Sequence, residues 1–116
     1  MAHDIIVYHN PRCSKSRQAL QFLDQKGLEY TVIEYLKSPL SEQELKMILK
    51  KLKVNAASII RKGESVFKEN FKGKDLTEEE YISAMVNFPK LIERPIVIKG
   101  NQAVIARPHD RIESLL

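Results

Sequence analysis

Residues 5–27 of the chain read IIVYHNPRCSKSRQALQFLDQKG. The stretch opens with a run of apolar β-formers, Ile5 to Tyr8, which ends in an Asn-Pro pair typical of a turn. From Ser14 to Lys26 the apolar residues recur at helical spacing, and Gly27 stands where a helix C-cap is expected. The segment therefore predicts a buried first strand, a short loop and a helix.

Further β-rich segments predict the rest of a sheet. Residues 30–35 follow the helix after a very short link, and two strands that flank a helix of this length favour a parallel βαβ unit. Near the other end of the chain, the short β runs 96–98 and 103–105 are joined through a Gly-Asn pair suited to a tight hairpin with positive φ. An antiparallel strand pair is expected there, and a weak final helix is expected after Pro108.

The middle of the chain is predicted to be helical. Ser41 with Glu44, and Thr77 with Glu80, both match the capping box, in which a hydroxyl and a carboxylate satisfy unpaired amides at a helix start. Each pair is expected to open a helix with an apolar face. The segments expected between these helices are a short helical stretch at 56–61 and an exposed loop at 63–74.

The order β, α, β, helical section, β, β, α predicts an α/β fold. It is the order of a thioredoxin/glutaredoxin-like mixed sheet, with a helical insertion at about 39–90 between the βαβ and ββα halves. A chain of 116 residues is long enough to build the hydrophobic core of one domain and too short for two domains of ordinary size. A single domain over residues 1–116 is therefore expected.

Composition narrows the class of protein. Apolar residues make up 43% and charged residues 29%, and no apolar run approaches the roughly 20 residues of a membrane helix. Asp4 lies where a signal peptide would carry positive charge, so a cytoplasmic location without membrane contact is expected. The formal net charge of +4 favours anionic ligands through long-range attraction.

The chain contains a single cysteine, Cys13. No internal disulfide can form, and a structural zinc site built on several thiolates is excluded, so no bound metal is expected. Any disulfide chemistry at Cys13 must recruit a second thiol from another molecule.

Cys13 lies between a predicted strand end and a predicted helix start. Free backbone amides and the positive end of a helix dipole favour a thiolate there, and Arg12, Lys15 and Arg17 add positive charge. A lone cysteine is often only a small buried apolar residue. The polar, cationic loop favours a reactive nucleophile instead.

Two polar neighbours of Cys13 are further candidates for catalytic roles. Ser16 occupies the position of the second cysteine of a Cys-x-x-Cys motif, so its hydroxyl could donate to the Cys13 sulfur but could not resolve a disulfide. It could equally be an ordinary capping hydroxyl in the first helical turn. His9 could relay protons or orient the loop, although solvation is the plainer interpretation of a polar residue at a strand end.

These residues belong to a wider pattern. The chain carries His9-Asn10-Pro11-x-Cys13-x-x-Ser16-Arg17, then Arg61, then Arg94-Pro95-Ile96-Val97, and finally Arg107-Pro108. In content, order and spacing this pattern resembles the glutaredoxin-coupled arsenate reductases, over nearly the whole chain.

The resemblance implies a thioredoxin-like fold and an enzyme that reduces arsenate to arsenite. In that family the residues matching Cys13, Arg61, Arg94 and Arg107 are the nucleophile and three oxyanion binders. Glutathione then attacks the arsenylated cysteine, and glutathione with glutaredoxin completes the reduction. No bound cofactor is implied, because glutathione acts as an external thiol co-substrate. Pro95 fixes the chain before an apolar strand and is a candidate cis-proline.

Other functions of the same fold stay open. One is a redox-responsive transcriptional regulator that binds RNA polymerase, but such proteins carry a paired Cys-x-x-Cys switch where this chain has Ser16. Another is a general glutathione-dependent thiol-disulfide oxidoreductase. Nucleic-acid binding is not expected, because the lysine-rich helix after Ser41 lacks the aromatic residues on which bases stack.

Overall fold

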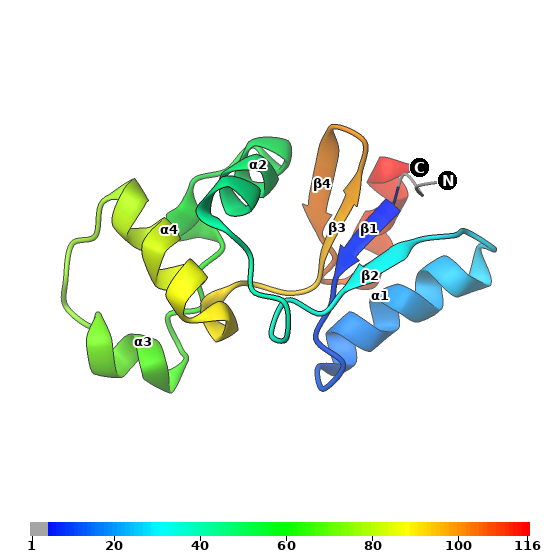
Figure 1. The fold of residues 1–116 in the computed structure, drawn as a ribbon. Coiled ribbons are helices and arrows are strands. Elements are labelled where there is room, and N and C mark those ends of the chain that lie inside the picture. The colour runs from blue at the N-terminus through cyan, green and yellow to red at the C-terminus, as the bar shows by residue number, and fades with distance from the viewer. Residues whose placement is uncertain (1–4) are drawn as a thin grey trace. The chain divides into compact units, whose positions relative to one another are not determined.

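The computed structural model describes residues 5–116. A four-stranded mixed sheet has the order β2-β1-β3-β4 (Figure 1). Its strands are β1 (Ile5–Tyr8), β2 (Thr31–Ile33), β3 (Ile96–Lys99) and β4 (Gln102–Ile105). Strand β1 pairs with β2 in parallel, whereas β1 with β3 and β3 with β4 are antiparallel. The parallel βαβ unit and the antiparallel hairpin are both confirmed.

The predicted helices are present in the predicted order, together with two short helical segments, at 65–70 and 89–91, that the sequence did not predict. They are α1 (Ser14–Gln25), α2 (Glu42–Leu52), α3 (Ser65–Asn70) and α4 (Glu78–Asn87), with 3-10 helices η1 (Ala56–Ser58), η2 (Pro89–Leu91) and η3 (His109–Leu115). The chain divides into two compact units, one of which is Pro39–Glu93 and holds all the helices from α2 to η2. The other unit comprises the residues up to Ser38 together with Arg94–Leu116. We call them the helical unit and the sheet unit.

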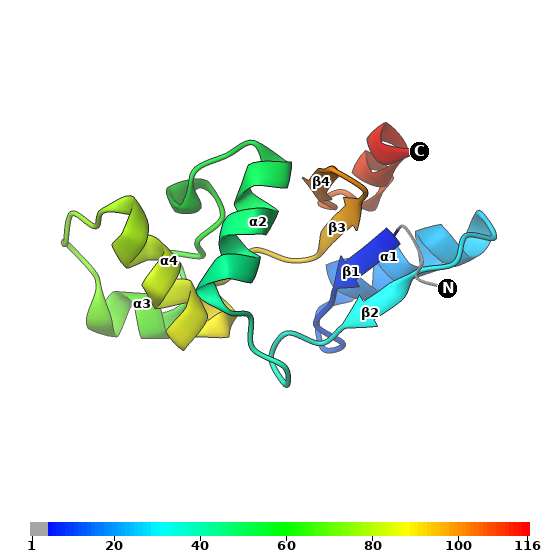
Figure 2. The same ribbon diagram turned by 45° about the horizontal axis from the view of Figure 1, so that its top comes forward.

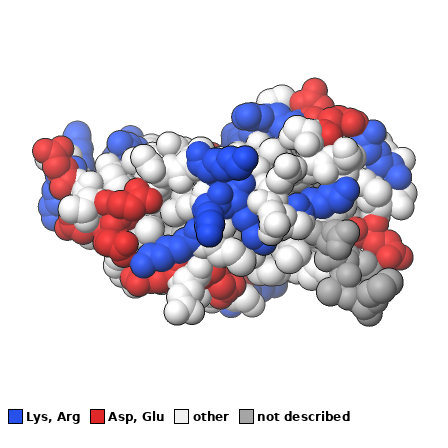
Figure 3. Space-filling view, turned by 90° about the horizontal axis from the view of Figure 1, so that it is seen from above, with Lys and Arg blue, Asp and Glu red and all other residues white. Residues whose placement is uncertain are grey.

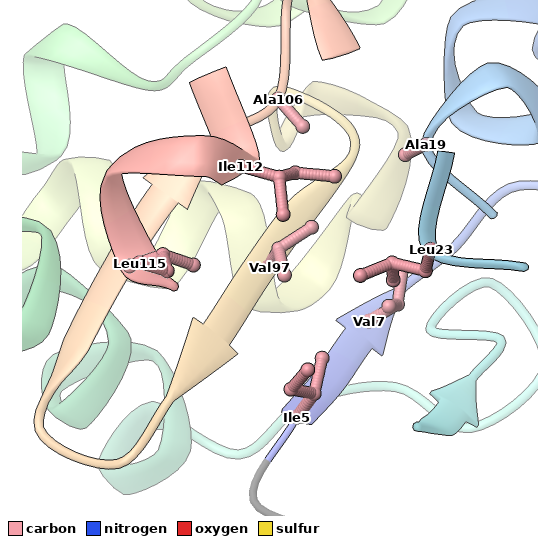
Figure 4. Packing of buried hydrophobic residues seen from close by; sticks show 8 residues of the cluster. All are labelled: Ile5, Val7, Ala19, Leu23, Val97, Ala106, Ile112 and Leu115. Carbon is pink, nitrogen blue, oxygen red and sulfur yellow. The ribbon is translucent and has the colours of Figure 1, made fainter. Parts of the chain in front are cut away.

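One face of the sheet is covered by α1 and η3. Figure 4 shows the side chains of β1 and β3 directed toward those of the two helices. Side chains two residues apart in a strand share a face, which is why alternate residues of β1 enter this core. The members of the core cluster are Ile5, Val7, Ala19, Leu23, Val97, Ala106, Ile112 and Leu115. A second view, in Figure 2, shows α1 lying along the strands of the sheet unit.

Both predicted capping boxes are present in the helical unit. The Ser41 hydroxyl accepts from the backbone N–H of Glu44 at 3.1 Å, and the Glu44 carboxylate accepts from the N–H of Ser41 at 3.3 Å. Thr77 and Glu80 exchange the same pair of hydrogen bonds at 2.9 and 3.2 Å. Two helix starts are therefore determined by local residues alone.

Three details differ from the expectations. The segment 63–74 is not an exposed loop: it contains α3, in which Phe67 is buried and packs against Phe71 one turn later, with ring centroids 5.6 Å apart. Because charged and polar residues surround these two phenylalanines in the sequence, the segment lacks the repeated apolar spacing that predicts a helix. Strand β2 is only three residues long, shorter than the predicted segment 30–35. In the hairpin, Gly100 takes φ 61°, but Asn101 does not take a positive φ.

Candidate active site

Cys13 lies at the junction of the loop and α1. It is the N-cap residue of the helix and is half-buried. The loop before it is held by its own hydrogen bonds: the Cys13 N–H donates to the Asn10 carbonyl at 3.0 Å, and the Arg12 N–H donates to Asn10 Oδ1 at 3.0 Å. The Arg17 guanidinium donates to the Pro11 carbonyl at 2.8 Å. The turn and the first helical turn therefore fix the position of the sulfur.

The surroundings of Cys13 favour its thiolate. Burial alone raises the pKa of the Cys13 thiol, but backbone N–H groups of Ser16 and Lys15 and the Arg94 side chain donate to the sulfur. Together with the charge of Arg94 they outweigh burial and hold the pKa below its ordinary value. The helix start therefore lowers the pKa of Cys13 through its backbone N–H groups, as predicted. The positive charge that lowers this pKa further belongs to Arg94, which is distant in sequence.

His9 and Ser16 form a buried polar pair. His9 Nδ1 and Ser16 Oγ lie 2.6 Å apart, and the Ser16 hydroxyl also accepts from the backbone N–H of Asn10 at 3.0 Å. His9 is only 6% exposed, so the interpretation of this residue as solvated is wrong. Burial lowers the pKa of His9, Arg17 lowers it further, and Glu34 opposes the shift, which keeps the imidazole neutral near pH 7.

Arg94 and Arg107 meet at the C-terminal half of the sheet unit. Strand β3 pairs with both β1 and β4, so the residues preceding β3 and following β4 lie at one end of the sheet. The Arg107 guanidinium donates to the Arg94 carbonyl at 3.4 Å, which is a long hydrogen bond. The Arg94-Pro95 bond is cis, as predicted, and so is the Arg107-Pro108 bond, which no sequence pattern predicted.

Arg61 lies in the helical unit, with two carboxylates near its guanidinium. Its Nη1 donates to Glu93 Oε1 at 3.2 Å, and its Nη2 lies 3.7 Å from Glu64 Oε2. The approach of Arg61 to Cys13 stays a prediction. No local sequence pattern predicts a role for Glu93 or its pairing with an arginine that lies 32 residues earlier.

Charged side chains of both signs occur on the face of the protein that Figure 3 shows. On this face, Lys and Arg side chains occur across the view, with Asp and Glu side chains between them at both ends.

Within residues 5–116, no group of three or more His, Cys, Asp or Glu is placed to hold a metal ion. In the same residues, no helix has both the length and the apolar character needed to cross a membrane.

A cysteine with a lowered pKa, at the start of the helix that follows the first strand of such a mixed sheet, defines a thiol protein of the thioredoxin-like fold. The model of the ArsC family matches residues 8–115, and the chain belongs to this family.

Proteins similar to this chain agree with the family. The chain is 43% identical over 114 residues to the uncharacterized protein YfgD of Escherichia coli strain K12, a match that covers 97% of this chain and 96% of YfgD. It is 39% identical over 114 residues to an arsenate reductase of Haemophilus influenzae, with 97% and 98% covered. The solved structure of an arsenate reductase from Vibrio cholerae matches with a TM-score of 0.93 and 38% identity over 100% of both chains. The expected fold is confirmed.

Proposed function

We propose that this protein reduces arsenate to arsenite, with Cys13 as the nucleophile and with glutathione and glutaredoxin supplying the electrons. The observation that carries the proposal is the half-buried Cys13 thiol at the start of α1, whose pKa is lowered by backbone amides and by Arg94. The relatives named arsenate reductases, at 39% and 38% identity over nearly the whole chain, support the choice of substrate.

The proposed reaction follows from the single thiol. The Cys13 thiolate attacks arsenic, so that an S–As bond forms and an As–O bond breaks, and the departing hydroxide leaves as water after protonation. Glutathione then attacks the arsenylated cysteine, and the electron pair of the S–As bond passes to arsenic, which is reduced from As(V) to As(III). This attack leaves a mixed disulfide between Cys13 and glutathione, and the glutaredoxin thiol attacks its glutathione sulfur, so that Cys13 leaves as the thiol and glutaredoxin carries the glutathione. Overall, arsenate and two thiols give arsenite, a disulfide and water.

We propose that Arg61, Arg94 and Arg107 bind the oxyanion. Attack of a thiolate on arsenate brings two negative groups together, so cationic donors must offset their repulsion and stabilise the adduct. The planar guanidinium makes paired charge-assisted hydrogen bonds to tetrahedral oxyanions. The hydrogen bond between Arg107 and the Arg94 carbonyl, and the bond from Arg94 to the sulfur, support this assignment for these two arginines.

His9 and Ser16 are proposed to position the loop. Their short buried hydrogen bond, with the bond from the Asn10 N–H, ties the end of β1 to the first turn of α1. A rigid loop holds the sulfur in one place while it attacks, which lowers the barrier of the step. A cytoplasmic location, where glutathione keeps thiols reduced, fits an enzyme with one cysteine and no bound cofactor.

The test is an assay of arsenate-dependent NADPH oxidation in the presence of glutathione, glutathione reductase and glutaredoxin. The proposal expects turnover that stops when glutathione is omitted and is absent in Cys13→Ser. A parallel reaction with a glutathione mixed disulfide in place of arsenate identifies a general oxidoreductase, which would favour the disulfide. Undiminished multiple turnover with thioredoxin as the only thiol donor would contradict the glutathione-dependent mechanism.

A further inference from the structure

The backbone of the helical unit fixes Arg61 and Glu93 beside each other. The Arg61 N–H donates to the Leu91 carbonyl at 2.7 Å, and the Glu93 N–H donates to the Ile59 carbonyl at 2.8 Å. These bonds flank an isolated antiparallel bridge formed by two isoleucines that are at most 8% exposed. In this register Arg61 is opposite Leu91 and Glu93 is opposite Ile59, so Arg61 and Glu93 are diagonal neighbours on one face of a hydrogen-bonded frame.

The side chains continue this pairing. Arg61 Nη1 donates to Glu93 Oε1 at 3.2 Å, whereas the 3.7 Å between Arg61 Nη2 and Glu64 Oε2 is too long for a hydrogen bond. The exposed fractions of the two carboxylate side chains are nearly equal, 29% for Glu93 and 31% for Glu64. Glu93 is thus the bonded partner, and Glu64 is a neighbour of the same charge and similar exposure.

Most donors of Arg61 are left for another acceptor. The hydrogen bond to Glu93 occupies one N–H of the guanidinium, and Arg61 Nε is buried without an acceptor among residues 5–116. A buried N–H without a partner is costly, and in native proteins it usually has a water or a ligand as acceptor. An oxyanion oxygen would supply that acceptor.

We propose that Glu93 is a positioning residue for oxyanion binding, which holds the Arg61 guanidinium in the orientation that receives arsenate. The inference rests on the proposed function of Arg61. A free arginine side chain samples many rotamers, and fixing it before the ligand arrives removes part of the ordering cost of binding. Glu93 supplies that constraint through one bond and leaves the remaining donors of Arg61 in place.

The experiment compares Glu93→Ala, Glu93→Gln and the matched control Glu64→Ala. Arsenate affinity is measured without turnover, as the protection of Cys13 from iodoacetamide, and KM and kcat for arsenate are measured beside it. Glu93→Ala is expected to weaken arsenate binding about tenfold and to raise KM more than it lowers kcat. Glu93→Gln keeps an acceptor for Arg61 and should stay within about threefold of the wild type. Glu64→Ala should stay within about twofold.

Each other outcome overturns the inference. Tighter arsenate binding in Glu93→Ala would mean that the carboxylate competes with the substrate. Equal effects of Glu93→Ala and Glu64→Ala would mean that both residues act only through their negative charge. Unchanged affinity in Glu93→Ala, with active wild-type enzyme, would remove the inference and leave the proposed function intact. A wild-type protein that arsenate neither protects nor engages as a substrate would remove both. If Glu93→Ala fails to fold, loss of affinity in a folded Glu93→Gln would contradict the positioning role.

Discussion

The sheet unit and the helical unit use arginine in different ways. In the sheet unit, the Arg94 side chain donates to the Cys13 sulfur and helps to lower the pKa of the thiol. In the helical unit, Arg61 is hydrogen-bonded to the Glu93 carboxylate and lies near a second one. One residue type therefore serves two purposes in this protein. Arg94 tunes the nucleophile, whereas Arg61 is kept aligned by a counter-charge until, on our proposal, the substrate binds.

The largest effect is expected at Arg94. Arg94→Lys keeps a positive charge but loses the planar fork, so kcat/KM for arsenate should fall roughly a hundredfold to a thousandfold, as on loss of an oxyanion donor. Steady-state kinetics of arsenate reduction measure the effect. The control is Arg111→Lys, at an exposed arginine of η3, which should be silent. Equal activity of Arg94→Lys and wild type would contradict the distinct role given to the arginine of the sheet unit.

Core truncations test whether the units are coupled in folding. Leu23 in the sheet unit and Leu45 in the helical unit are both 0% exposed, so each change to Ala should cost about 2–5 kcal/mol of stability. If the expected single domain folds cooperatively, both variants shift one shared transition in urea, followed by circular dichroism. Two separate transitions, each moved by only one variant, would show that the units unfold independently.

Helix caps provide a smaller effect confined to the helical unit. Ser41→Ala and Thr77→Ala each remove a hydroxyl that accepts from the third helical N–H, at a cost of about 1 kcal/mol. Urea denaturation measures the loss, with Ser38→Ala, at an exposed serine outside any helix, as the control. Arsenate kinetics should be nearly unchanged in both cap variants, and a selective loss of activity would argue against a purely structural role.

The smallest effect is expected from the buried imidazole of the sheet unit. Burial lowers the pKa of His9 in the folded state, so the unfolded chain binds more protons as the pH falls below about 6.5. The free energy of unfolding should therefore decrease from that pH toward the folded-state pKa. His9→Asn should flatten this dependence, measured by urea denaturation between about pH 5 and 8. An equal slope in wild type and variant would contradict the lowered pKa of His9.

Sequence patterns predicted those features of the fold that depend on residues close together in the chain. Both capping boxes, the Gly27 helix end with φ 69° and the cysteine at a helix start depend on residues within one or two turns, and all are present. Long-range partners could not be predicted in this way. The bond from Arg94 to Cys13 depends on the pairing of β1 with β3, and the contact of Arg61 with Glu93 depends on a bridge between distant segments.

The proposed mechanism requires a thiolate at Cys13, so titration of this thiol is its most direct test. The rate of Cys13 alkylation by iodoacetamide, followed by mass spectrometry as a function of pH, gives the pKa of the thiol. We predict a midpoint below the ordinary value of about 8.5 and a higher midpoint in Arg94→Gln, because that change removes a charge and a strong donor at the sulfur. A wild-type midpoint at or above that of a free cysteine would rule out the lowered pKa on which the proposed mechanism depends.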